Sequence, residues 1–186
     1  MRLLWLSALV LLSAPRLAAQ TVIHPAPPLD SARAALRDAL VLLSDSLGTI
    51  DAAAARLQRD YREASGPSLL SRARTMHEAC TRSIGMVPPT RDRVLATKVS
   101  ESQRIKHRRE LVGALDQLKT ALNHCESEFA KMSQPGQSEI VRGYGNDRAT
   151  KVQDALRSYE RTLREFFGVM GIRVIPPGAE TKPSSG

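Results

Sequence analysis

The sequence is poor in aromatic side chains and in cysteine. Its 186 residues include one Trp, three Tyr, three Phe and two Cys. Surfaces that bind single-stranded nucleic acid need aromatic faces on which bases stack. We therefore do not expect nucleic acid to be the partner of this basic chain, although its net charge is +8. The charge is better attributed to solubility or to attraction toward an anionic surface.

Several catalytic and cofactor motifs are also missing. The chain has no Gly-x-Ser-x-Gly nucleophile elbow, no glycine-rich phosphate loop and no Cys-x-x-Cys-His run for covalent haem. Its acidic side chains stand mostly near arginines, as in YERTLREF at 159–166, which is typical of solvated helices. These features favour a non-enzymatic protein without a resident cofactor.

Long apolar runs are absent as well. The longest, 3–14, is shorter than the roughly 20 residues that cross a membrane. It follows Arg2 and precedes a proline and small residues, which is the layout of a secretory signal peptide. We expect cleavage after Ala19, so that residues 1–19 are removed and the chain is exported. Removal lowers the Lys and Arg total from 27 to 25, against 19 acidic residues, and no later run is long enough to span a bilayer.

The remaining chain reads as one domain with two irregular ends. Three prolines within 20–29 predict an extended lead-in. Residues 176–186 are rich in Pro, Gly and Ser and predict a disordered tail. Residues 30–175 are of a suitable size for a single domain.

Within that domain, four segments carry apolar residues at the heptad-like spacings of amphipathic helices. The four seams contain Leu36, Leu40, Leu43, Leu47, Ile50, Ala54, Leu57 and Tyr61; Leu69, Ala73, Met76 and Cys80; Leu111, Leu115, Leu118, Leu122, Cys125, Phe129 and Met132; and Val152, Leu156, Tyr159, Leu163, Phe166 and Met170. Such seams are too long to be left in water, so they predict an all-α, four-helix bundle.

Two connecting stretches are less regular. Residues 134–146 contain three glycines and a proline and predict a loop. Residues 90–102 are charged and have few apolar anchors, so they fit either a short helix or an irregular crossover.

The two cysteines predict a disulfide. Cys80 and Cys125 both occupy inward-facing seam positions, and an even cysteine count in an exported protein favours a bridge. His77 and His124 raise the alternative of a zinc or copper site, and two free thiols are a further alternative. Adjacent helical residues are rotated by about 100°, so His124 and Cys125 do not converge easily on one ion.

A disulfide also constrains the chain path. If a helix started at Thr90 after a tight hairpin, Cys125 would lie about 50 Å along it, whereas Cys80 would lie within about 15 Å of the turn. The two α-carbons of a disulfide must come within about 7 Å. We therefore predict a long crossover at 86–103 that runs back along the bundle and makes the second and third helices parallel.

The run RIKHRRE at 104–110 is the densest basic feature. Its cations are candidates for contact with an acidic partner or with lipid headgroups. They are Arg104, Lys106, Arg108 and Arg109.

Together these features predict an exported, non-enzymatic bundle of the bacterial envelope that acts through protein or surface contacts. A haem- or metal-binding bundle is the first alternative. Its potential donors are Met76, Met132, Met170, His77, His107 and His124. The second alternative is a chaperone-like or stress-responsive binding protein.

Overall fold

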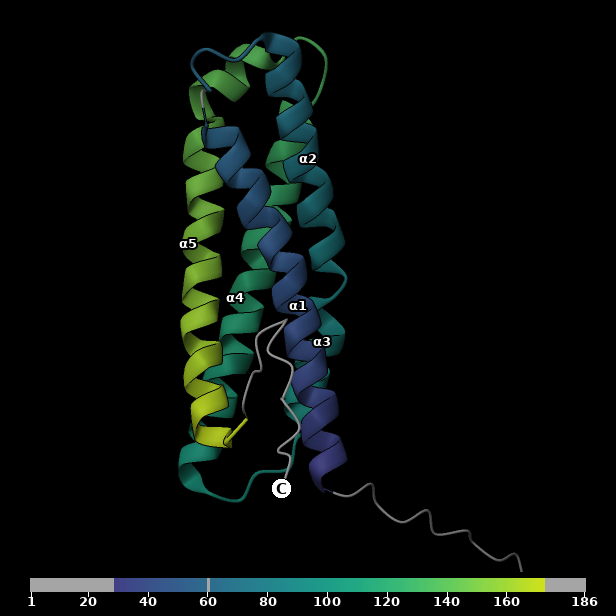
Figure 1. Ribbon diagram of the computed structural model, residues 1–186, viewed down its shortest axis with the longest axis vertical. Helices are drawn as coiled ribbons and strands as arrows, with labels where there is room; N and C mark the ends of the chain where they lie inside the picture. Colours follow the sequence, from purple (N-terminus) through teal and green to yellow (C-terminus); the bar gives the residue numbers. More distant parts are fainter. Residues whose placement is uncertain (1–28, 60, 173–186) are drawn as a thin grey trace, which may run out of the picture.

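The computed structural model describes residues 29–59 and 61–172. These residues form helices and short connections, without a β-strand. The helices are α1 (Leu29–Gln58), α2 (Gly66–Ile84), α3 (Val87–Ala96), α4 (Ser102–Met132) and α5 (Ser138–Met170). Because α2 and α3 join into one bent helix, the architecture is the predicted four-helix bundle (Figure 1).

The apolar seams form the core of this bundle. Residues such as Leu40, Leu69, Leu115 and Phe166 are fully buried and belong to one continuous cluster. The burial of these seams against one another provides the main driving force for the fold. The predicted signal peptide at 1–19, most of the lead-in at 20–29 and the tail at 176–186 lie outside the described residues.

The long crossover predicted at 86–103 is wrong. Only Gly85 and Met86 separate α2 from α3, and Met86 keeps helical backbone angles (φ −87°, ψ −20°). Pro88 and Pro89 occupy the first turn of α3, where a missing backbone N–H costs no helical hydrogen bond. The prolines therefore begin a new helix in nearly the same direction, and α4 returns antiparallel to it (Figure 1).

Side-chain contacts confirm the antiparallel path. Going down α2 and α3, Cys80 pairs with Cys125, Arg91 with Asp116, and Thr97 with Arg108. The residue numbers of the α4 partners decrease as those on α2 and α3 increase, which requires opposite helix directions. Extending the helix to Ala96 also moves the turn away from Cys80, so the disulfide forms without parallel helices.

The loop predicted at 134–146 is shorter than expected, since α5 already starts at Ser138. Gly145 lies inside the helix and is buried against α1. A Cβ atom there would lie 3.2 Å from Val141 Cγ1 and 3.5 Å from Leu57 Cδ2. This glycine therefore marks a close helix approach, whereas Gly136, with φ of 84°, lies in the actual turn.

Candidate functional site

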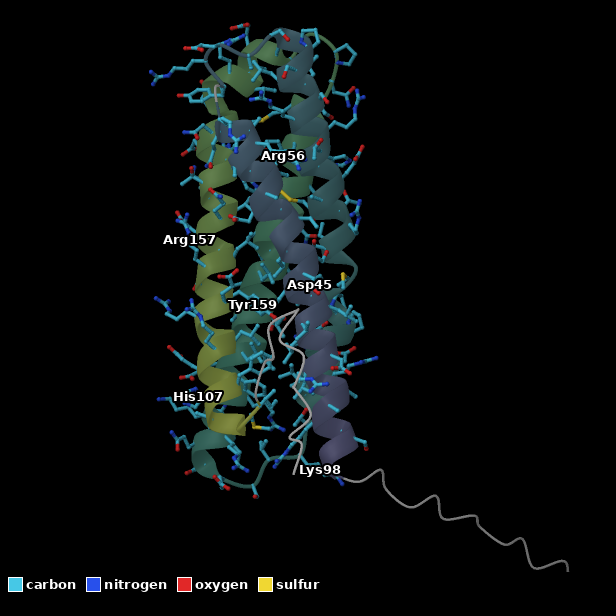
Figure 2. All side chains as sticks on the ribbon, viewed as in Figure 1. Asp45, Arg56, Lys98, His107, Arg157 and Tyr159 are labelled. Atoms are coloured by element: carbon cyan, nitrogen blue, oxygen red, sulfur yellow. A yellow bond between two sulfur atoms is a disulfide. The ribbon has the colours of Figure 1, made fainter. Side chains whose placement is uncertain are left out.

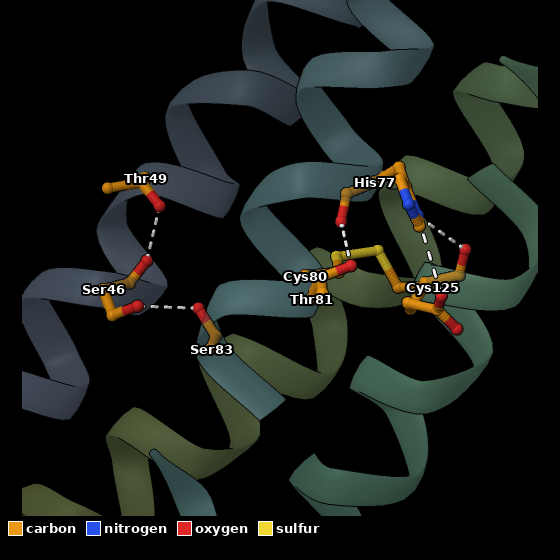
Figure 3. Close-up of a disulfide and its surroundings, with 8 residues drawn as sticks. Ser46, Thr49, His77, Cys80, Thr81, Ser83 and Cys125 are labelled. Carbon is orange, nitrogen blue, oxygen red and sulfur yellow. Dashed lines mark hydrogen bonds and ion pairs between the residues drawn. A yellow bond between two sulfur atoms is a disulfide. The ribbon is translucent and has the colours of Figure 1, made fainter. Parts of the chain in front are cut away.

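The predicted disulfide is confirmed. Cys80 on α2 and Cys125 on α4 are buried and bonded, with their α-carbons 6.2 Å apart (Figure 3). Both thiols are therefore consumed by a covalent link between two helices, and the two cysteines lie 45 residues apart in sequence. Neither cysteine remains as a metal ligand or nucleophile.

The two nearby histidines lie apart from each other. His77 Nδ1 lies 3.2 Å from the carbonyl oxygen of Glu126, which can only accept, so Nδ1–H is the donor in this contact (Figure 3). The same nitrogen is 3.8 Å from the Glu126 carboxylate. His124 is exposed on the other flank of α4, where it borders a hollow of about 50 Å³ facing α5. Among the described residues, no group of three or more His, Cys, Asp and Glu is arranged to hold a metal.

The potential methionine donors for haem are also dispersed. Met76, Met132 and Met170 are all buried among apolar side chains. Met132 ends α4 and Met170 ends α5, so these two residues lie at opposite ends of the antiparallel bundle. Their positions are those of core residues that fill space between helices.

The basic run at the start of α4 divides into two pairs. The half-buried Arg108 donates through Nη1 to the carbonyl oxygens of Thr97 at 2.8 Å and Leu95 at 3.5 Å. The half-buried Arg104 lies 3.3 Å from Glu101. Arg108 thus links the start of α4 to the end of α3, whereas the Arg104–Glu101 pair lies at the first turn of α4 itself.

The other two cations of the run face solvent. Lys106 is exposed and lies 3.8 Å from Glu110. Arg109 is exposed and makes no ion pair or hydrogen bond with another described residue. Of the four predicted contact residues, Lys106 and Arg109 are therefore the two that are exposed.

A groove between α1 and α2 was not predicted from the sequence. Its lining comprises Thr49, Ala52, Ala53, Arg56, Thr75, Glu78, Ala79 and Arg82. We call it the α1–α2 groove. The small residues Ala52, Ala53 and Ala79 leave space for such a hollow. Predicting the hollow from the sequence would require knowing which faces of α1 and α2 meet.

Buried polar contacts fix the register of α1 against its neighbours. Ser46 and Ser83 lie 2.8 Å apart, and both hydroxyls are buried (Figure 3). Gln153 on α5 donates to Asp51 at 2.7 Å and accepts from Gln58 at 3.0 Å. Buried polar groups without partners are costly, so these pairs favour one alignment of the helices over shifted ones.

Among the described residues, two side chains have a pKa that clearly departs from its ordinary value. Burial raises the pKa of Tyr159 well above its ordinary value of 10.0. The nearby Ser44 side chain partly offsets this effect, although the phenol oxygen makes no well-formed hydrogen bond. A hydrogen bond from Arg91 to Asp116, 2.6 Å long, raises the pKa of that guanidinium. Neither Arg91 nor Tyr159, which is labelled in Figure 2, lines the hollow beside His124 or the α1–α2 groove.

No protein-family model, curated protein or solved structure matches this chain. Within the part of the chain that the structure describes, no helix is both long and apolar enough to span a membrane. Function must therefore be argued from the surface itself.

Proposed function

We propose that this chain is an exported, non-enzymatic binding protein of the bacterial envelope whose basic end contacts anionic groups. The observation that carries the proposal is the division of the basic run. Arg104 and Arg108 are engaged by the fold, whereas Lys106 and Arg109 remain exposed beside them. Exposed cations attract anionic surfaces over a range set by ionic strength.

The disulfide supports the proposed location. Disulfides persist in oxidising compartments such as the bacterial periplasm and are rare in the cytosol. The sequence features of residues 1–19 favour export in the same way. Cell fractionation with mass spectrometry of the amino terminus tests this part, and an uncleaved cytosolic protein would contradict it.

The binding proposal is tested with two defined anionic probes, phosphatidylglycerol vesicles and polyglutamate, in low salt. We expect Lys106→Gln with Arg109→Gln to weaken binding to at least one probe. The matched control, Arg157→Gln with Arg161→Gln, removes the same charge from exposed positions on α5 and should bind nearly as well as the wild type. Equal losses in both variants, or no wild-type binding to either probe, would refute the proposal.

A further inference from the structure

The α1–α2 groove is lined by both small and charged side chains. Its lining includes three short side chains, the buried Ala53 and Ala79 and the exposed Ala52. Arg56 borders it from α1, while Glu78 and Arg82 border it from α2, and all three charged side chains are exposed. None of the three makes an ion pair with another described residue, in contrast to most carboxylates on α4.

The charges follow one another along the groove. The contact between Ser46 and Ser83 places these two residues at the same height. At about 1.5 Å per residue, Arg56 lies about 15 Å above that level, Glu78 about 7.5 Å above it and Arg82 about 1.5 Å above it. Positive, negative and positive groups thus alternate at intervals of little more than one helical turn.

An exposed leucine lies on α1 below the level of these three charges. Leu42 is 59% exposed, the second highest value among the exposed large apolar side chains. Leu42, Thr49 and Arg56 are seven residues apart and so lie on one side of α1. Leu42 lies outside the groove lining, about 6 Å below the level of Ser46, and offers an apolar contact to a helix that extends beyond Arg82.

The groove provides few hydrogen-bonding groups for a foreign backbone. The Thr49 hydroxyl donates to Ser46 O at 2.7 Å, and the Thr75 hydroxyl donates to Ser71 O at 3.1 Å. An extended segment would leave many of its peptide groups without partners on the groove side. A helix satisfies its own backbone, and the short alanine side chains allow it to approach closely.

We infer that the α1–α2 groove binds an amphipathic helix of a partner protein. The complementary helix carries an acidic, a basic and again an acidic side chain about one turn apart, followed by an apolar residue that covers Leu42. This surface lies on α1 and α2 rather than at the basic end of α4. The inference therefore goes beyond the proposed function and requires neither Lys106 nor Arg109.

The test uses a 21-residue helical peptide with Glu, Lys, Glu and Leu one turn apart on one face and neutral residues elsewhere. We expect fluorescence anisotropy to show binding that Arg56→Glu with Arg82→Glu weakens about tenfold or more, because charge reversal turns attraction into repulsion. The double variant should instead prefer the charge-reversed peptide, with Lys, Glu, Lys and Leu. Lys106→Glu with Arg109→Glu carries the same charge change and should leave binding nearly unchanged.

A second variant tests the shape of the groove without changing charge. Ala52→Leu adds bulk to the groove lining and should weaken binding, whereas Ala55→Leu, at another exposed alanine of α1 outside the groove lining, should not. Equal effects of both variants, or equal binding of both peptides, would overturn the inference. A proline-interrupted peptide that binds equally well would contradict helical docking.

Two further outcomes separate this inference from related ones. Self-association of the chain that is abolished by Arg56→Glu would show that a second copy occupies the groove and would overturn the assignment to a partner. Peptide binding by a wild-type protein that binds neither vesicles nor polyglutamate would refute the basic-end contact alone. The reverse result would refute the groove alone.

Discussion

Above the bend at Gly85 and Met86, α4 is joined to α2 by many buried side chains and a disulfide, whereas below it α3 contributes two buried valines, Val87 and Val94, and arginine contacts near the surface. The upper pairing includes the fully buried Met76 and the Cys80–Cys125 bond. The lower pairing includes the exposed Arg91–Asp116 ion pair and the carbonyl contacts of Arg108.

These different contacts imply that stability against local opening differs between the parts of the bent helix above and below Gly85 and Met86. Exposed ion pairs contribute little because water and salt screen them, while buried apolar contacts and a covalent link resist local opening. We therefore expect the lower end to open at a smaller free energy than the upper part. A flexible lower end would also carry the exposed Lys106 and Arg109.

The largest expected effect comes from removing the disulfide. Replacing Cys80 and Cys125 by alanine should lower the free energy of unfolding by about 4 kcal/mol, because the bond closes a long loop in the unfolded chain. Urea unfolding of the double variant measures this loss. Reduced wild-type protein provides the control that retains both side chains, and a loss below about 1 kcal/mol in both would show that packing alone holds the upper pairing.

A smaller effect is expected at the lower pairing. Arg108→Met keeps much of the side-chain bulk but removes the donor to Thr97 and Leu95. Charge-assisted hydrogen bonds contribute about 1.5–3 kcal/mol, and partial exposure reduces this to about 1–2 kcal/mol here. Amide hydrogen exchange should accelerate in α3 and remain slow around Cys80.

Arg109→Met is the matched control for that variant, since Arg109 has no partner among the described residues. It should leave exchange in α3 nearly unchanged. Uniform acceleration across α2 and α3 in the Arg108 variant would contradict the distinction between the two regions.

Much of the fold was predictable because the apolar seams repeat over many turns. The inward positions of Leu40, Leu115 and Cys125 follow from that repeat alone. The bend was not predictable in the same way, because Pro88 and Pro89 can equally follow the end of one helix or occupy the first turn of the next. Gly145 presented a similar ambiguity, which only the close approach of Leu57 resolves.

The candidate sites were also predictable only in part, because the sequence does not show which residues of separate helices meet. The disulfide was predictable from two inward-facing cysteines. The split of the basic run was not, since only the position of the α3–α4 connection reveals that Arg108 is engaged by carbonyl groups. The α1–α2 groove depends on the register set by Ser46 and Ser83, which two separate stretches of sequence do not disclose.

The smallest effect is expected at the level of the bend, where the buried Tyr159 lies close to Ser44 on α1. Burial raises the folded-state pKa above 10.0, so the unfolded chain loses the phenol proton first. The stabilising contribution is therefore complete below pH 10 and falls as the pH rises further, by about 1 kcal/mol near pH 11. Urea unfolding between pH 8 and pH 11 should show this loss in the wild type and less of it in Tyr159→Phe.

At neutral pH the variant should be nearly as stable as the wild type, because the hydroxyl lacks a well-formed hydrogen bond. Identical pH profiles would show that the phenol ionises as readily in the folded chain as in the unfolded one, and that water reaches the bundle at the bend.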